Sequence, residues 1–169
     1  MTTDILHRLP SGPLRILFVC SGNTCRSPMA EILARRAADE NGVEGYEFRS
    51  AGTSTVNGLP ASEGARRAAE RHGLSLAGHT STVLTPSAIE WADLVLPMAP
   101  KHLQRVAAAG GEAKAILLAA FAEGLESEEE HFGVPDPFGG DDQTYEATLT
   151  TLDALVTAAL DRLSKEDRK

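Results

Sequence analysis

The stretch CSGNTCRSP, Cys20 to Pro28, decides the fold of this chain. It follows the apolar run LRILFV, Leu14 to Val19, and precedes a helical pattern that begins at Pro28. Cys20 and Arg26 therefore bracket five residues on a turn between a strand and a helix. Such a turn directs backbone N–H groups toward an anion at the N-terminus of the helix. The stretch predicts a phosphate-binding loop after the first strand.

The residue types in this loop suit a cysteine nucleophile. A thiol at its base would face the N–H dipoles and the Arg26 guanidinium, and both favour the thiolate. Gly22 and Asn23 tolerate left-handed backbone angles, so the loop can close around a tetrahedral anion. Ser27 can place its hydroxyl near the sulfur or cap the helix, and Pro28 suits the first helical position. The residues expected to hold the anion are Ser21, Gly22, Asn23, Thr24, Cys25 and Arg26.

These features predict attack of sulfur on phosphorus, with the loop holding the phosphoryl oxygens. Such a reaction needs a proton donor for the leaving atom. Asp136 in GVPDPFGG is the candidate, because Pro135 and Pro137 stiffen the backbone around it and the following glycines allow a tight turn. A bare Cys and Arg at this spacing also fits a buried cysteine and a surface arginine, and Asp-Pro alone often marks a turn.

Composition restricts the class of protein. The 169 residues suit one domain, which we expect over 14–169, with residues 1–13 as a loose N-terminal extension. The longest apolar runs are too short to span a bilayer, and the N-terminus has no signal-peptide pattern. The two cysteines both lie in the loop, which argues against a disulfide scaffold and favours a cytoplasmic protein. A net charge of −8 makes nucleic acid a poor partner, and we expect no membrane partner.

Apolar periodicity predicts strands that alternate with helices along the chain. Such alternation indicates an open α/β sheet, mostly parallel, with helices on both faces, in which ligands bind at the carboxyl ends of the strands. Cys20 follows one of those ends. We expect strands over 14–19, 46–52, 92–98 and 113–119, and helices over 28–41, 61–73, 86–91, 100–109 and 141–164.

Segments across most of the chain resemble the low-molecular-weight protein-tyrosine phosphatase family. They are VCSGNTCRSPMAE, FRSAG from Phe48 to Gly52, GHTS around His79 followed by ADLVLPM, and DPFGG from Asp136. The resemblance implies a four-stranded parallel sheet of order 2-1-3-4, and neither a metal nor any other cofactor. It also implies a phosphorylated protein as the substrate.

The resemblance implies a role for each matching residue. Cys20 would be the nucleophile and form a phosphocysteine, and Arg26 would bind the phosphate and stabilise the transition state. Asp136 would protonate the leaving group and then activate water. The residues expected to support the loop are Ser27, which would hydrogen-bond the thiolate, and Asn23, Ser50 and His79, which would form a network.

Cys25 resembles the second loop cysteine of the family. The resemblance implies a reversible disulfide between Cys25 and Cys20 that protects Cys20 from over-oxidation. Plain packing is the alternative for Cys25, and an ordinary surface or core histidine is the alternative for His79.

The chain departs from the tyrosine-specific members at the walls of the pocket. Val56 stands near the place of one aromatic wall, and Phe138 followed by Gly139 stands in place of a Tyr pair. Thr24 occupies a loop position where Ile is common in tyrosine phosphatases. In these respects the chain looks like the bacterial protein arginine phosphatase branch, in which Thr24 and Phe138 would set substrate selectivity. Phosphoarginine is therefore favoured over phosphotyrosine.

Two other functions remain open from the sequence. Arsenate reduction on the same scaffold resembles thiol cascades with further downstream cysteines, and none lies beyond Cys25, although a partner thiol could substitute. A non-catalytic anion-binding module would not need an acid, so the presence of Cys20, Arg26 and Asp136 together argues against it.

Overall fold

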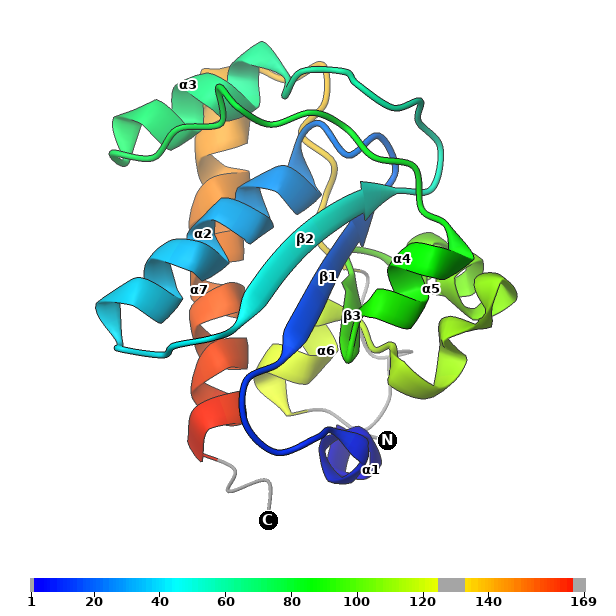
Figure 1. Cartoon of the computed structure of the whole chain (residues 1–169). Coiled ribbons are helices and arrows are strands. Elements are labelled where there is room, and N and C mark those ends of the chain that lie inside the picture. Colours follow the sequence, from blue (N-terminus) through cyan, green and yellow to red (C-terminus); the bar gives the residue numbers. More distant parts are fainter. Residues whose placement is uncertain (1, 125–132, 166–169) are drawn as a thin grey trace.

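A parallel sheet forms the centre of the molecule (Figure 1). The structure is a computed structural model that describes residues 2–124 and 133–165. Its strands are β1 (Arg15–Cys20), β2 (Glu47–Gly52) and β3 (Leu94–Pro97), in the order β2-β1-β3. The α/β class, the parallel pairing and the three strands expected first along the chain are confirmed.

The strand register places Cys20 at the carboxyl end of β1, the central strand. Cys20 pairs with Gly52 of β2, and Val19 pairs with Pro97 of β3. Because the strands are parallel, their carboxyl ends lie at the same end of the sheet, where the loops that follow β1, β2 and β3 lie close together.

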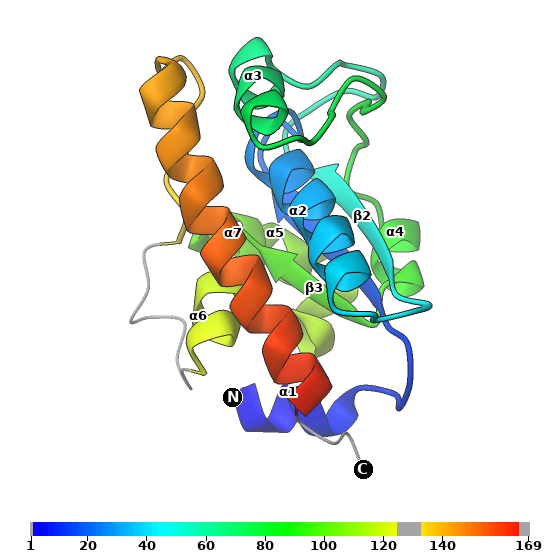
Figure 2. The ribbon, with the colours of Figure 1, turned by 90° about the vertical axis from the view of Figure 1, so that its left-hand side faces the viewer.

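Helices cover both faces of the sheet (Figures 1 and 2). Helices α2 (Arg26–Glu40) and α7 (Asp142–Lys165) lie against one face, with α6 (Leu118–Glu123) and α3 (Glu63–Arg71) packed on α7. Helices α4 (Pro86–Trp91) and α5 (Pro100–Val106) lie against the other face. Short helical turns, η1 (Ala107–Gly111) and η2 (Glu112–Lys114), connect α5 to the next segment.

Side chains of β1 alternate between two apolar clusters, as successive residues of a strand must. Ile16, Phe18 and Cys20 belong to the cluster shared with α2, α6 and α7. Leu17 and Val19 belong to the cluster shared with α4 and α5. This alternation directs the Cys20 side chain to the face on which α2 begins.

The segment 113–119 is not the predicted fourth strand. Ala115 forms an isolated parallel bridge with Val95 of β3, but η2 precedes it and α6 begins at Leu118. A short apolar run fits a buried strand or a buried helix equally well, and leucine and alanine favour the helix. A sheet of four strands in the order 2-1-3-4 is therefore not confirmed.

The N-terminal segment is more ordered than the sequence predicts. Within residues 1–13, expected as a loose extension, α1 (Thr2–Arg8) forms and packs near η2. Ile5, Leu6 and Leu9 are buried and join the main apolar cluster. Ile5 and Leu6 lie on α1 and Leu9 directly follows it, so burial of these three apolar side chains explains why the segment docks. In the described part of the chain, no helix combines the length and apolar character needed to cross a membrane.

Candidate active site

The loop between β1 and α2 lies where the sequence predicts it, but α2 begins earlier than expected. β1 ends at Cys20 and α2 begins at Arg26, two residues before the expected Pro28. Pro28 therefore lies within the first turn of α2, where a missing N–H costs nothing because such groups have no partner in the helix. Arg26 and Ser27 are buried at this helix start, next to the Cys20 side chain.

A chain of hydrogen bonds ends at the Cys20 sulfur. Asn23, fully buried and with a left-handed φ of 56°, accepts the Thr82 N–H on Oδ1 at 2.8 Å. Its Nδ2 donates to Ser27 Oγ at 2.8 Å. Since this oxygen accepts from Asn23, the Ser27 hydrogen is available for Cys20 Sγ, 2.9 Å away. The contact expected between Ser27 and the Cys20 sulfur is therefore present, and Asn23 is held by Ser27 and Thr82, two partners that the sequence did not predict.

His79 supports the loop, as expected, and Ser50 has a different partner. The His79 Nε2–H donates to the Asn23 carbonyl at 2.7 Å, which fixes the loop at its left-handed residue. The Ser50 hydroxyl instead donates to Glu31 Oε1 of α2 at 2.7 Å. Among the hydrogen bonds of residues 2–124 and 133–165, none joins Ser50 to the loop. Ser50 therefore ties β2 to α2, the helix that follows the loop.

Asp136 lies beside Arg26. Its Oδ2 is 3.5 Å from Arg26 Nη2, and its side chain is 46% exposed, whereas that of Arg26 is 4% exposed. Arg26 Nη1 donates to the Val134 carbonyl at 3.0 Å. Asp136 Oδ1 accepts the Phe138 N–H at 3.1 Å, which closes the turn predicted from the Pro and Gly residues. The distant acid is therefore brought to the loop.

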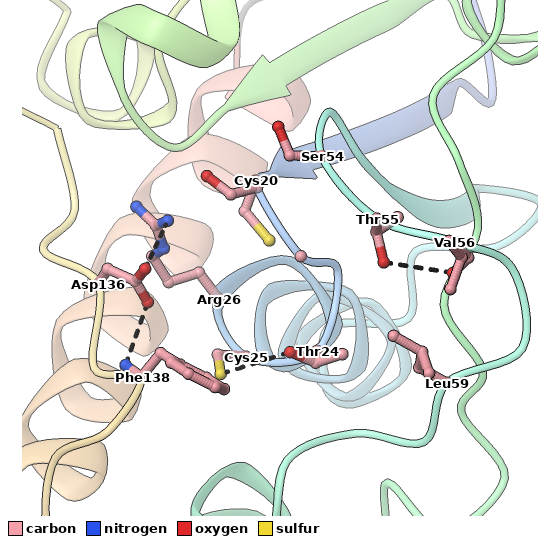
Figure 3. A pocket seen from close by; sticks show the side chains of 12 residues that line it. Cys20, Thr24, Cys25, Arg26, Ser54, Thr55, Val56, Leu59, Asp136 and Phe138 are labelled. Atoms are coloured by element: carbon pink, nitrogen blue, oxygen red, sulfur yellow. Dashed lines mark hydrogen bonds and ion pairs between the residues drawn. The ribbon is translucent and has the colours of Figure 1, made fainter.

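A cavity opens above the Cys20 sulfur (Figure 3). Asp136 and Phe138 stand on one side of it, and Val56 and Leu59 stand on the opposite side. The residues that line it are Cys20, Ser21, Gly22, Thr24, Cys25, Arg26, Ser54, Thr55, Val56, Leu59, Asp136 and Phe138.

The cavity walls are mainly aliphatic and polar. Among the described residues that line it, Phe138 is the one aromatic side chain, and it is 72% exposed. Val56 and Leu59, also exposed, provide the opposite wall. Val56 and Phe138 thus lie in the lining, where the sequence places them, and Leu59 is a wall residue that the sequence did not indicate.

Cys25 is the N-cap residue of α2, and its thiol contacts three hydroxyl groups. Its Sγ lies 3.1 Å from Ser62 Oγ, 3.5 Å from the hydroxyl of Tyr145, a residue of α7, and 3.7 Å from Thr24 Oγ1 (Figure 3). Burial and the contact with Cys25 raise the pKa of Tyr145. Both cysteines are free thiols, so the disulfide implied for Cys25 and Cys20 stays a prediction.

His102 of α5 is a second neighbour of the loop that the sequence did not indicate. It is fully buried, and its Nε2 lies 2.8 Å from Ser21 Oγ. Burial, together with the positive charges of Arg26 and Lys101, lowers the pKa of His102 to about 4. A single histidine on a short helix belongs to no motif, and only the packing of α5 against the sheet edge brings it to the loop.

The side chains that meet at this site suit the binding of an anion. In residues 2–124 and 133–165, no cluster of three or more His, Cys, Asp or Glu side chains could hold a metal ion. Arg26 Nε is buried without a hydrogen-bond partner, so it is a donor available to an anion in the loop. A sulfur, a guanidinium and a carboxyl group thus converge on one cavity, as nucleophilic attack on phosphorus requires.

Comparison with known proteins agrees with this geometry. The family model for low molecular weight phosphotyrosine protein phosphatases matches residues 15–169. A protein-arginine-phosphatase of Geobacillus stearothermophilus is 35% identical over 156 residues, which are 91% of this chain and 99% of that protein. The low molecular weight protein-tyrosine-phosphatase Etp of Escherichia coli (strain K12) is 33% identical over 150 residues, 89% of this chain and 95% of that protein.

A solved structure extends the similarity to the whole fold. A YwlE arginine phosphatase, in a Cys-to-Ser mutant with a phosphorylated active site serine, superposes with a TM-score of 0.83 at 36% identity. The match covers 92% of this chain and 99% of that one. The chain therefore belongs to the low molecular weight phosphotyrosine protein phosphatase family and is a cysteine-dependent protein phosphatase.

Proposed function

We propose that this phosphatase hydrolyses phosphoarginine in proteins. The observation that carries the proposal is the cavity lining, in which the Thr24 hydroxyl and the Asp136 carboxylate stand among aliphatic side chains rather than between aromatic rings. A guanidinium is planar, polar and cationic, so it gains from a hydroxyl and a carboxylate. A phenyl ring gains most from stacking on other rings, and among the described residues of the lining Phe138 alone offers that.

Each residue of the site has its own role in the first step of the reaction. The Cys20 thiolate attacks phosphorus, the phosphorus–nitrogen bond breaks, and Asp136, which enters this step protonated, delivers its proton to the leaving guanidine nitrogen. Arg26 and the N–H groups of the loop hold the phosphoryl oxygens as charge redistributes over them. Ser27 donates to the sulfur and so orients it within the loop.

The second step returns the enzyme to its starting state. Water attacks the phosphorus of the phosphocysteine, Asp136 accepts the proton of that water, and the phosphorus–sulfur bond breaks to release inorganic phosphate and Cys20. An arginine phosphatase among the similar structures carries phosphate on a serine that replaces its cysteine, which supports a phosphorylated residue at this place.

Paired peptides test the substrate. Peptides of one sequence, carrying phosphoarginine or phosphotyrosine, are compared by kcat/KM from phosphate release at neutral pH. We expect the wild type to prefer phosphoarginine, and Thr24→Ile to reduce that preference about tenfold, the effect of one hydrogen bond to a charged group. A wild-type preference for phosphotyrosine would overturn the proposal.

Two further substitutions distinguish the effect of the Thr24 hydroxyl group on substrate preference from the effect of the shape of the side chain. Thr24→Val has nearly the same shape without the hydroxyl, and Thr24→Ser keeps the hydroxyl in a smaller side chain. We expect Thr24→Ser to retain more of the preference for phosphoarginine than Thr24→Val. The opposite order would show that Thr24 acts by its volume and not by a hydrogen bond.

A further inference from the structure

We infer that His102 is a positioning residue that turns the hydroxyl group of Ser21 toward the phosphoryl group bound in the loop. Ser21 would then bind the phosphoryl oxygens with its side chain as well as with its backbone N–H. The inference rests on the proposed function, since the phosphoryl group in question is that of the substrate.

The two residues meet at the base of the cavity. His102 lies on α5, is fully buried, and has its Nε2 at 2.8 Å from Ser21 Oγ. Ser21 is the residue after Cys20 and lines the cavity. The contact therefore joins a buried imidazole behind the loop to a hydroxyl group next to the nucleophile.

The surroundings of His102 keep its ring neutral near pH 7. The ring is buried, and the guanidinium of Arg26 and the ammonium of Lys101 repel a proton, while the carboxylate of Asp136 favours one. The balance lowers the pKa of His102 to about 4. A neutral imidazole carries a single N–H, so the position of that hydrogen decides how the ring contacts Ser21.

The buried Nδ1 atom identifies the tautomer. Nδ1 of His102 has no hydrogen-bond partner. A hydrogen on Nδ1 would be a buried donor without an acceptor, which costs the full desolvation of that group. A hydrogen on Nε2 instead donates to Ser21 Oγ and leaves a lone pair at Nδ1, which the positive charges of Arg26 and Lys101 stabilise. The Nε2–H tautomer is therefore favoured.

This tautomer determines what the Ser21 hydroxyl does. Its oxygen accepts from His102, so its own hydrogen needs another acceptor, and no second partner is present among the hydrogen bonds of the described residues. A phosphoryl dianion offers only acceptors. Arg26 Nε is also a buried donor without a partner. The Ser21 O–H and the Arg26 Nε–H are thus two donors that a phosphoryl group would satisfy together.

The tautomer can be measured directly in the full-length protein. The protein is labelled with ¹⁵N at histidine, and two-bond ¹H–¹⁵N spectra are recorded at neutral pH, with the His102 signals assigned from their loss in His102→Gln. We expect a neutral ring that carries its hydrogen on Nε2, with and without inorganic phosphate. A hydrogen on Nδ1, or a doubly protonated ring, would overturn the inference.

Paired variants test the hydroxyl group of Ser21. Ser21→Thr and Ser21→Val have nearly the same shape, and only the first has a hydroxyl. We expect Ser21→Val to bind inorganic phosphate about tenfold more weakly than Ser21→Thr, and its kcat/KM for an aryl phosphate to be lower by a similar factor. Equal phosphate binding by the two variants would contradict the inference.

A second pair tests His102 itself. His102→Gln keeps an N–H donor near the place of Nε2, whereas His102→Leu does not. We expect phosphate binding to be weaker in His102→Leu than in His102→Gln, and Ser21→Val to abolish that difference. Inorganic phosphate and aryl phosphates lack a guanidine group, so these results do not depend on the preference for phosphoarginine. A preference for phosphotyrosine would overturn the proposed function and leave the inference standing.

Discussion

The carboxylate of Asp136 lies 3.5 Å from the guanidinium of Arg26, although the two residues belong to distant parts of the chain. The same guanidinium donates to the carbonyl of Val134, two residues before Asp136. The Arg26 side chain is almost completely buried, whereas that of Asp136 is 46% exposed, so solvent partly screens the ion pair and screens the buried bond to Val134 less. One arginine therefore holds the segment that carries the acid against the loop that carries Cys20.

The first prediction concerns the acid. Asp136→Asn keeps the shape of the side chain and removes its proton, so kcat/KM for phosphoarginine should fall about a hundredfold or more. The ratio kcat/KM reports the steps up to the phosphocysteine, and for an aryl phosphate whose leaving group needs no proton the fall should be much smaller. Steady-state kinetics on both substrates would check this.

Asp39→Asn provides the control, because this carboxylate is exposed near the far end of α2. It should leave both ratios unchanged. An equal loss on both substrates in Asp136→Asn would mean that Asp136 acts by bracing Arg26 and not by proton transfer.

Part of this site could be predicted from the sequence because its residues stand in local patterns. Cys20 and Arg26 are set by their spacing after an apolar strand, and Asp136 is marked by the prolines beside it. No local sequence pattern of this kind identifies His102 or Tyr145. Each is one polar residue on a helix, and only the tertiary packing of that helix brings it within hydrogen-bond distance of the loop.

The second prediction concerns the strained residue of the loop. Asn23 has a φ of 56°, and its side chain bonds to Ser27 and to the Thr82 N–H. Asn23→Ala and Asn23→Gly both lose these bonds, but only glycine adopts a left-handed φ without steric cost. Asn23→Ala should therefore be less stable than Asn23→Gly by about 1 kcal/mol, measured as the free energy of unfolding in urea.

The ranking of these two variants is informative in either direction. Glycine also makes the unfolded chain more flexible, which lowers the stability of Asn23→Gly and reduces the difference. If Asn23→Ala proved the more stable of the two, the left-handed conformation would not be a source of strain in this loop.

The fold was predictable where the apolar pattern admits one interpretation. The run from Leu14 to Val19 is a strand buried on both faces, and the structure has it so. The run at 113–119 is also largely apolar, but its last two residues, Leu118 and Ala119, are buried in the first turn of α6. Periodicity cannot distinguish a buried strand from a buried helix in so few residues, and tertiary contacts decide the outcome.

The third prediction concerns α1. Leu6 is 6% exposed and packs into the main apolar cluster, so Leu6→Ala should lower the free energy of unfolding by about 2–3 kcal/mol. His7→Ala changes an exposed position of the same helix and should cost less than about 0.5 kcal/mol. α1 lies at the end of the molecule opposite the loop, so neither variant should change kcat (Figure 1). Equal stability of the two variants would show that α1 does not dock in solution.

The fourth prediction is a pH dependence of stability caused by His102. Its pKa is lowered from 6.5 to about 4 in the folded chain, through burial and the charges of Arg26 and Lys101, against the opposing charge of Asp136. Between these two values the unfolded chain binds the proton and the folded chain does not. Stability is therefore lost as the pH falls through this window, by about 1.4 kcal/mol per pH unit for one such group.

His102→Gln removes this titration, so its free energy of unfolding should fall less steeply than that of the wild type as the pH is lowered from about 6.5 to about 5. Urea unfolding at several pH values in that window would measure both slopes. The comparison is between slopes, so it holds even if the substitution lowers stability at every pH. Equal slopes would mean that His102 takes up its proton in the folded protein as readily as in the unfolded chain, and the imidazole behind the loop would then be charged when the enzyme is mildly acidified.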